Sequence, residues 1–444
     1  MRIGNVKINI LKQMLVLSMI ILAFGFTSKA AGVSDYGALK VSGRYLTSSK
    51  TGDKVILRGV STHGINWDVG YPYISKDAFS TLKDEYAVNA IRLAMYTTEY
   101  FGYCDKAGAG ESQESVRSTL KERIDNGVKA ATELDMYVII DWHVLNDQNP
   151  NKYKKEAKAF FKEISEKYAS YDNVLYEICN EPNGGTSWSD ISKYANEVIP
   201  VIRKNDSDAV IIVGTPTWSQ DVDIAAESPL AFDNIMYTLH FYAATHKDNY
   251  RDKLKKALDK ELPVMVTEYG LSEASGNGNI DTSEGAKWLD LLDENSISYF
   301  AWSLSNKDES SALLKAGSSK KSGWSEGDLS KAGKWVFSQY KKRAGVTNVD
   351  TLRKVIGLKL KNVKGKKISA KWSAVSGADG YQIVYSTNSK FKKSKKKQVT
   401  STAVKLSKLK KKKTYYVKLR AYKNAGAGKK FGKYSAVKKI KIKK

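Results

Sequence analysis

The apolar run Tyr137-Val138-Ile139-Ile140, followed directly by Asp141-Trp142-His143, is the stretch that decides the fold. A short, continuous run of β-branched and aromatic residues is typical of a strand that is buried on both faces. The polar residues come where such a strand ends. Seven more runs of this kind occur along the chain, at residues 55–60, 90–93, 174–178, 210–213, 235–238, 264–267 and 299–302.

Segments with helical periodicity and mixed charge lie between these runs, among them residues 112–134, 152–168 and 250–260. Buried strands that alternate with amphipathic helices indicate a parallel sheet covered on both faces. Eight such units in about 300 residues favour a closed α/β fold, the (β/α)8 TIM barrel, over an open doubly wound sheet. No Gly-x-Gly-x-x-Gly follows the first strand, so a dinucleotide-binding protein lacks its main support. We expect the barrel over residues 31–343.

The positive charge of the chain is confined to its C-terminal end. The 444 residues carry a net charge of +26, but residues 351–444 hold 31 Lys and Arg and a single acid, Asp379. The preceding 350 residues have 42 basic and 46 acidic side chains, a net charge of −4. This difference predicts a separate second unit at 352–444, joined to the barrel by a linker at 344–351.

The basic unit has the pattern of a small all-β sandwich, with alternating runs at 368–372, 381–385 and 415–422 between Gly, Ser, Asn and Lys turns. It is similar to a fibronectin type III domain. Trp372, Gly380-Tyr381 and the last of these runs, which is followed by Asn424, Gly426 and Gly428, carry the likeness.

The lysine runs of this unit, such as 395–397 and 410–413, leave three interpretations open. Solvated lysines at strand edges discourage edge-to-edge pairing. A dense positive surface also attracts an anionic polymer of the cell envelope or plant wall. Nucleic acid is the least favoured partner, because no aromatic-basic RNA motif is visible and the N-terminus indicates export.

The first 30 residues are typical of a signal peptide. Arg2, Lys7 and Lys12 precede an apolar run at 14–26, and Ser28-Lys29-Ala30 offers small residues for cleavage. The run is shorter than the ~20 residues that span a bilayer, so we expect a secreted, extracellular protein, with a retained N-terminal anchor as the alternative. Of the two cysteines, Cys179 is expected to be a buried free thiol, and a bridge to Cys104 stays open.

Side chains capable of chemistry lie at or just after the ends of seven of the eight predicted strands: His63, Arg92, Asp141 to His143, Asn180 to Pro182, His240 and Tyr242, Glu268 to Gly270, and Trp302. The carboxyl ends of parallel strands meet at one mouth of a barrel. Core packing does not account for so many polar strand ends, so we predict a functional site there.

Glu181 and Glu268 follow the fourth and seventh predicted strands and should face each other across that mouth. Two carboxyl groups suit glycoside cleavage. A retaining mechanism places them about 5–5.5 Å apart, whereas inversion needs a wider gap for a water. Two close carboxyl groups also resist double ionisation, so one stays protonated as the acid while the other, beside Arg92, stays a carboxylate.

Seven motifs resemble glycoside hydrolase family 5, and within it the bacterial endoglucanases (cellulases) of the second subfamily. They are STHGINW at 61–67, IRLAMY at 91–96, IDWH at 140–143, ICNEP at 178–182, HFY at 240–242, VTEYG at 266–270 and AWSLSNKDE at 301–309. The likeness extends in order over residues 36–343. It implies a retaining endo-β-1,4-glucanase with Glu181 as acid/base and Glu268 as nucleophile.

The resemblance also implies roles for the neighbours of the two glutamates. Asn180 would hold the sugar 2-hydroxyl, Arg92 and Tyr242 would hydrogen-bond the nucleophile, and His143 and His240 would contact the sugar and orient the carboxylates. Flat sugar faces match rigid aromatic rings. The expected substrate-binding residues are His63, Trp67, Tyr96, His143, Tyr242, Ala274, Ser275, Trp302, Lys307 and Glu309. For Trp188 and Trp218 we expect packing in the core or in loops.

A β-mannanase, a mixed-linkage glucanase and a xyloglucanase on the same barrel remain the nearest alternatives, and a non-catalytic glycan-binding protein is the alternative of another class. Both glutamates argue against a pure binder. No cofactor is expected. No metal site is expected from His63, His143, His240 and His246, because no His-x-His pair or close His/carboxylate cluster is visible in the sequence. We expect a monomer that takes β-1,4-glucan as its substrate.

Overall fold

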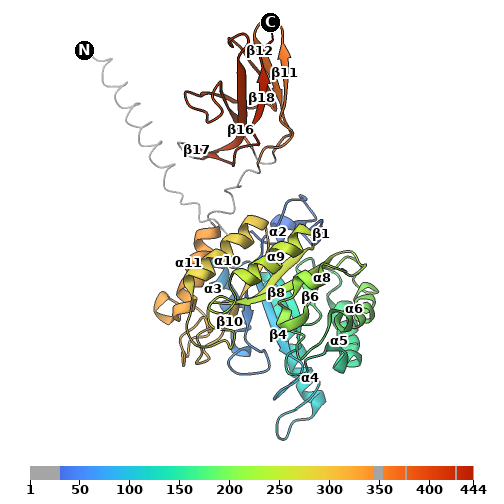
Figure 1. Cartoon of the computed structure of the whole chain (residues 1–444). Helices are drawn as coiled ribbons and strands as arrows, with labels where there is room; N and C mark the ends of the chain where they lie inside the picture. The colour runs from blue at the N-terminus through green and yellow to red at the C-terminus, as the bar shows by residue number, and fades with distance from the viewer. Residues whose placement is uncertain (1–30, 345–353, 376–377, 426–427, 444) are drawn as a thin grey trace, which may run out of the picture. The chain divides into compact units, whose positions relative to one another are not determined.

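The computed structural model describes residues 31–344, 354–375, 378–425 and 428–443 (Figure 1). The predicted signal peptide at 1–30 and almost all of the predicted linker lie outside these residues. The chain divides into two compact units, one through Ala344 and one in the residues after it. Each has its own hydrophobic core, so we describe the two units separately.

Eight parallel strands of the first unit close into a barrel in the order β10-β3-β4-β5-β6-β7-β8-β9, which confirms the predicted TIM barrel. The strands are β3 (Arg58–Thr62), β4 (Ala90–Tyr96), β5 (Tyr137–His143), β6 (Val174–Glu177), β7 (Ile211–Val213), β8 (Ile235–Tyr242), β9 (Val264–Gly270) and β10 (Tyr299–Leu304). Several strands run further than their apolar cores predicted. His143, His240 and Glu268 therefore lie inside strands, as Arg92 does, and ladder pairing fixes the backbone of all four.

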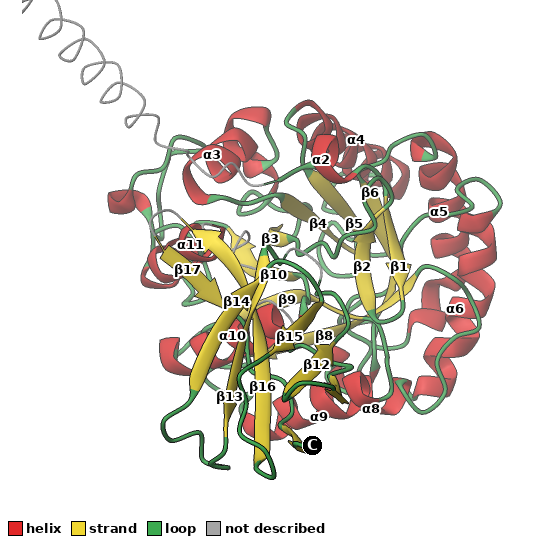
Figure 2. Cartoon of the chain, turned by 90° about the horizontal axis from the view of Figure 1, so that it is seen from above, coloured by secondary structure: helices red, strands yellow, loops and turns green. Residues whose placement is uncertain are grey.

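Figure 2 shows helices around the outside of these strands. The α-helices are α2 (Val33–Tyr36), α3 (Lys76–Tyr86), α4 (Gln113–Glu133), α5 (Lys154–Tyr168), α6 (Trp188–Arg203), α7 (Pro216–Ser219), α8 (Val222–Ala225), α9 (Asp248–Asp259), α10 (Thr282–Asn295) and α11 (Lys331–Ala344). Short 3₁₀ turns are η1 (Tyr71–Tyr73), η2 (Pro150–Tyr153) and η3 (Glu326–Asp328). The predicted helix at 112–134 is α4, whose N-cap Ser112 accepts a hydrogen bond from the Ser115 amide.

The alternation of β5 explains how one strand serves both the core and the mouth. Val138, Ile140 and Trp142 pack in the core formed with the surrounding helices. Tyr137 and Ile139 belong to a second cluster inside the barrel. Because side chains alternate along a strand, the polar residues Asp141 and His143 continue this inner row towards the carboxyl end of the barrel.

A hairpin of β1 (Leu39–Ser42) and β2 (Tyr45–Ser48) closes the other end of the barrel. Leu39 and Leu46 pack in the same cluster as Tyr137 and Phe300. Inside that cluster a Cβ at Gly59 would lie 2.0 Å from the Phe300 ring. The lower barrel is therefore packed with apolar side chains, which leaves the carboxyl end for a site.

The second unit is all-β, as predicted. One sheet has the order β11-β12-β15, formed by Lys359–Val363, Lys367–Lys371 and Ala403–Leu406. The other has the order β14-β13-β16-β17, formed by Lys395–Val399, Gly380–Ser386, Thr414–Ala425 and Gly428–Phe431, and β18 (Lys438–Lys441) also pairs with β16. Trp372 lies in the core between them with Tyr381 and Tyr415.

None of the helices in the described residues is long and apolar enough to cross a bilayer. Cys104 and Cys179 are free thiols, and Cys179 is buried as expected. Burial raises the pKa of the Cys179 thiol, which keeps it protonated and unreactive.

A chain that ends at Ala344 should fold independently, because among the described residues the core of the barrel unit contains none from the C-terminal unit. We expect its melting temperature, measured by calorimetry, to stay within about 2 °C of the barrel transition of the full chain. A large decrease in this temperature, or aggregation of the shortened chain, would contradict two independent cores.

Candidate active site

Arg92 on β4 lies at the centre of the barrel mouth and is fully buried. Its Nε and Nη2 atoms donate to the two oxygens of Glu177 at 2.8 and 3.1 Å, and Nη1 donates to Glu268 at 3.0 Å. Nη2 also lies 2.9 Å from Asp141 Oδ2 and donates to Asn180 Oδ1 at 2.6 Å. Burial alone would lower the pKa of Arg92, but Asp141, Glu177 and Glu268 outweigh it and keep the guanidinium charged.

Glu268 on β9 accepts a hydrogen bond on each carboxylate oxygen. Tyr242 Oη donates to Oε1 at 2.7 Å, and Arg92 donates to Oε2. Space for the Tyr242 ring comes from Gly270, because a Cβ there would lie 2.5 Å from the ring. Both contacts favour an ionised Glu268 and fix the direction in which it points.

A chain of hydrogen bonds behind Glu181 determines the tautomer of His240. Thr267 Oγ1 donates to Glu177 at 2.8 Å, so its hydroxyl proton is committed. Thr267 Oγ1 also lies 2.8 Å from His240 Nε2. Because its own proton is used, Thr267 Oγ1 can only accept this hydrogen bond, so Nε2 carries the proton and is the donor. His240 Nδ1 is then an acceptor that faces Glu181 Oε1 at 2.9 Å, so this bond requires a protonated Glu181.

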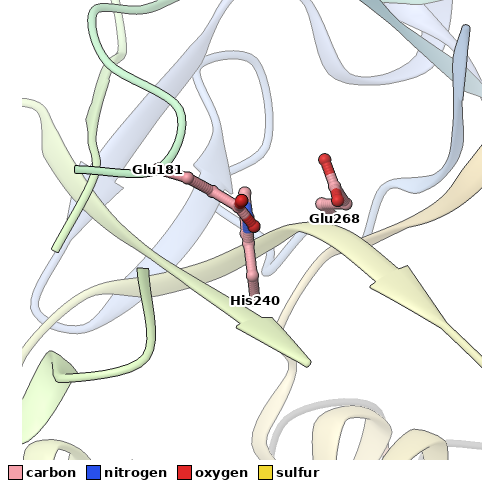
Figure 3. Close-up of side chains that lie close together, drawn as sticks. All are labelled: Glu181, His240 and Glu268. Atoms are coloured by element: carbon pink, nitrogen blue, oxygen red, sulfur yellow. The ribbon is translucent and has the colours of Figure 1, made fainter. Parts of the chain in front are cut away.

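The two glutamates therefore have unequal environments although they lie close together. Oxygens of Glu181 and Glu268 lie within 4.8 Å of each other, and Figure 3 shows Glu181 beside the His240 ring with Glu268 facing the same space. Burial and nearby acids raise the pKa of Glu181 to about 8. Burial and Glu181 raise the pKa of Glu268 to about 7, against the opposing effects of His240, Arg92 and Tyr242. Glu268 is thus the first of the pair to ionise.

His143 and Asn180 are oriented by the same network. His143 Nδ1 lies 2.6 Å from Asp141 Oδ2, and its Nε2 lies 3.2 Å from the amide nitrogen of Asn180. Since Asn180 Oδ1 already accepts from Arg92, the amide nitrogen is the donor to His143. Burial lowers the pKa of His143, so the ring is neutral. Asn180 is fixed in one orientation beside Glu181.

Aromatic rings line the mouth next to these polar groups. Tyr96, Tyr242 and Trp302 form a small cluster, with Trp67 packed against it. The Trp302 ring is stacked with His143 at 5.5 Å between centroids and lies 5.3 Å from His63. The predicted aromatic residues therefore come together in one place, beside the glutamates.

Lys307 and Glu309 lie in the loop after β10. Lys307 Nζ is 2.7 Å from Glu309 Oε2, and the other Glu309 oxygen is 3.9 Å from His63 Nε2. Burial, Lys307 and His143 lower the pKa of His63 to about 3, so this ring is neutral. The pair therefore borders the aromatic cluster on the His63 side.

Ala274 and Ser275 are exposed in the loop after β9. The Ala274 amide donates to Thr245, and Ser275 Oγ accepts from the Asn277 amide. This loop lies against the loop of Glu309, because the Ser311 amide donates to the Gly276 carbonyl at 3.0 Å.

The two remaining tryptophans differ from each other. Trp188 is buried in the core and donates to the Ser228 carbonyl, as expected. The expectation for Trp218 is wrong: its side chain is 45 % exposed. Its amide donates to the Pro182 carbonyl at 2.9 Å, one residue from Glu181, and its φ of 57° turns the chain there. Trp218 thus stands beside the site.

The structure also corrects the expectation that no histidine/carboxylate cluster is present. Glu181, His240 and Glu268 each offer one possible metal-ligand atom, all within 4.8 Å of one another. They come from separate strands, so spacing along the chain does not reveal the group.

Glu177, Thr267 and Trp218 are the residues that sequence reasoning missed. Glu177 and Thr267 are fully buried and polar, which is rare without a hydrogen-bonding purpose. Their signal in the sequence is weak, since each is a single polar residue at the end of an apolar run. Asp141, which the sequence placed at a strand end without a role, links Arg92 to His143.

Comparison with known families matches each unit. The family model described as cellulase (glycosyl hydrolase family 5) matches residues 48–308, and the fibronectin type III domain model matches residues 353–438. Endoglucanase A of Butyrivibrio fibrisolvens is 51 % identical over 306 residues, which are 68 % of each chain. An endoglucanase of Clostridium saccharobutylicum is 45 % identical over 363 residues, which are 82 % of this chain and 77 % of that one.

Solved structures are similar over the barrel unit. The catalytic domain of a Thermobifida fusca endoglucanase, in complex with cellotetraose, has 38 % identity and a TM-score of 0.64, and the match covers 70 % of this chain and 99 % of that one. A cellulase named Cel5C_n has 41 % identity and a TM-score of 0.64 over 71 % of this chain and 94 % of the other.

Replacing Thr267 by Val tests the tautomer. The valine leaves His240 Nε2 without its acceptor, so the proton can move to Nδ1 and donate to an ionised Glu181. We expect the pKa of Glu181, followed by ¹³C NMR of the labelled carboxyl, to fall below its value of about 8 in the unaltered protein. Thr267→Ser keeps the hydroxyl and is the control. An unchanged pKa in Thr267→Val would contradict the hydrogen-bond chain.

Proposed function

The chain belongs to glycoside hydrolase family 5 and is an endo-β-1,4-glucanase, and from this premise we propose that Glu181 and Glu268 cleave the bond with retention of configuration. The Glu268 carboxylate attacks the anomeric carbon, the glycosidic bond breaks, and Glu181 delivers its proton to the leaving oxygen. Glu181 then takes a proton from water, which attacks the glycosyl-enzyme and releases Glu268. The supporting observation is the carboxylate approach within 4.8 Å, since inversion uses a gap of about 6.5–9.5 Å.

The neighbours support each step through the contacts described above. Arg92 and Tyr242 hold Glu268 as an aimed carboxylate. In the resting enzyme His240 Nδ1 accepts a hydrogen bond from the protonated Glu181, which keeps the proton on the acid at neutral pH. Asn180, held by Arg92 and His143, would bind the sugar 2-hydroxyl, and His143 would contact the same sugar.

We further propose that the aromatic cluster binds successive glucosyl units. Trp302, Trp67 and Tyr96 offer rigid ring faces for the C–H faces of β-1,4-linked glucose, with Tyr242 and His63 beside them. Lys307 and Glu309 would bind sugar hydroxyls at one edge, and the loop of Ala274 and Ser275 would border that edge.

Trp218 lies on the side of Glu181, the residue that protonates the leaving group. Its exposed ring is therefore suited to bind the part of the glucan that departs. The preference among cellulose, lichenan, xyloglucan and mannan is tested by comparing reducing-sugar release from the four polymers.

The chain is proposed to be exported, to act as a monomer, and to attach through its basic C-terminal unit to an anionic wall or envelope polymer. The supporting observations are the N-terminal sequence and the 31 bases against one acid in residues 351–444. N-terminal sequencing of protein from the medium, expected to begin after Ala30, tests export. Light scattering of the purified protein tests the monomer.

The roles of the two glutamates predict different responses to substitution. Glu268→Gln should abolish turnover of every substrate. Glu181→Ala should reduce kcat on cellotetraose by about 10²- to 10⁴-fold but largely spare a dinitrophenyl cellobioside, whose leaving group needs no proton. Steady-state rates on both substrates measure this difference.

The exposed Glu163 on α5 offers the matched control, since Glu163→Gln removes a surface carboxylate that pairs with Lys121 and touches none of the site residues named above. NMR of the first product from the unaltered enzyme should show the β-anomer. Release of the α-anomer would exclude retention, and an equal loss on both substrates in Glu181→Ala would exclude its role as the acid.

The ring platforms should matter more than the charged edge. Trp302→Ala removes a large apolar contact, so we expect kcat/KM on cellotetraose to fall by about 10- to 100-fold. Lys307→Ala removes hydrogen bonds at the cleft edge and should cost less than about tenfold. Similar losses in both variants would contradict a stacking role for Trp302.

A further inference from the structure

The outward face of the β14-β13-β16-β17 sheet of the C-terminal unit carries a regular arrangement of cations and rings. Along β16 the side chains of Tyr415, Val417 and Leu419 pack in the core of that unit. Because strand side chains alternate, Lys418 and Arg420 lie on the opposite, outward face. The face is not part of the core, although both side chains are partly covered by their neighbours.

Rings and cations alternate along this face. Lys418 Nζ lies 4.3 Å from the ring centroids of both Phe391 and Tyr434. Arg420 Cζ lies 4.6 Å from the Tyr434 centroid and 3.9 Å from the Phe431 centroid. We call these five residues the cation–aromatic strip.

The strip is oriented by polar contacts and continues on β17. Arg420 Nε donates to Gln382 Oε1 at 3.1 Å, which orients the guanidinium on the sheet. Next to Phe431, the Tyr422 ring lies 6.0 Å away and has Lys429 Nζ at 4.1 Å from its centroid. A flat ligand on this face would therefore meet rings and positive charges in turn.

The other sheet of the same unit provides a contrast. On β11 and β12, Lys359, Lys361, Lys367 and Lys371 are exposed, while Ile368 and Ala370 point into the core. Lys405 is exposed on β15. These five lysines form a face that we call the lysine face. It has a similar supply of charge but no ring among these residues, so charge and rings can be tested separately.

We propose that the cation–aromatic strip binds an acidic polysaccharide whose sugars carry carboxylates. An aromatic ring matches the C–H face of a sugar, and a guanidinium beside it pairs with the carboxylate of a uronic acid. Residues 351–444, with 31 bases and one acid, are complementary to such a polymer in charge. The polysaccharide is favoured over other polyanions because the same chain hydrolyses a polysaccharide, β-1,4-glucan.

This inference rests on the proposed attachment of the C-terminal unit to an anionic polymer and assigns that attachment to one face. The probe is polygalacturonate, and binding of the full chain is measured by affinity electrophoresis over a range of salt concentrations. The comparison probes are neutral hydroxyethyl cellulose, single-stranded DNA and anionic phospholipid vesicles.

Two double variants remove equal charge from the two faces. Lys418→Ala with Arg420→Ala alters the strip, and Lys359→Ala with Lys371→Ala alters the lysine face. We expect the strip variant to weaken polygalacturonate binding at least about tenfold, because it removes two charges and also the side chains that lie between the rings. The lysine-face variant should weaken binding only about twofold, because it reduces the overall positive charge and leaves the rings and their cations in place.

Arg420→Lys separates geometry from charge, since lysine keeps the charge but loses the planar fork that stacks between Phe431 and Tyr434. It should lower the affinity at every salt concentration without changing the salt dependence. Its melting temperature confirms that the unit is folded.

The outcomes distinguish the two proposals. If the full chain does not bind polygalacturonate, attachment to an acidic polysaccharide fails as a whole. If it binds but both double variants lose affinity equally, attachment stands and the strip is wrong. Tighter binding to DNA or to vesicles than to polygalacturonate at matched salt would assign the strip to another polyanion, and salt-independent binding to hydroxyethyl cellulose would make it a neutral carbohydrate-binding face.

Discussion

The buried guanidinium of Arg92 is the interaction on which the site depends. An ionised carboxylate inside a barrel loses its hydration, which costs several kcal/mol unless a partner compensates. Arg92 is the compensating charge for Asp141, Glu177 and Glu268, and its fork geometry allows all three contacts at once. The charged side chains at the mouth can therefore lie directly against the apolar cluster inside the barrel.

The contacts of the two glutamates explain why they have different roles. Glu268 touches Arg92 and a tyrosine hydroxyl, whereas Glu181 donates a hydrogen bond to an imidazole nitrogen. The chain of Thr267 and Glu177 extends the influence of Arg92 to the far side of His240. Arg92 lowers the pKa of both carboxyl groups, but only Glu268 touches it, and at Glu181 burial together with Asp141 and Glu177 outweighs the cation and favours the protonated form.

Much of this could be predicted from the sequence, and the reasons for the exceptions are physical. Buried parallel strands are continuously apolar, so the runs located all eight strands, and barrel closure then placed Glu181 and Glu268 together. Several strand ends were predicted too early, because His143, His240 and Glu268 are polar residues that remain in the ladder.

Thr267 escaped attention because its importance lies in the direction of one hydroxyl proton, which depends on partners from β6 and β8. The exposure of Trp218 was not predicted, because the sequence does not distinguish a tryptophan in a left-handed turn from one in a core. The cluster of Glu181, His240 and Glu268 escaped because its members are neighbours only across the barrel.

The scarcity of acids in the C-terminal unit has a consequence for how the enzyme senses its surroundings. Lysine and arginine keep their charge from about pH 4 to pH 9, so residues 351–444, with Asp379 as their only acid, present an almost constant charge over that range. Its attraction to a polyanion would respond to ionic strength instead. The glutamates of the barrel show the opposite sensitivity, because they titrate near neutrality and are buried away from mobile ions. Acidification would alter catalysis and leave attachment in place, while a rise in salinity would release the enzyme from the polymer without disabling it.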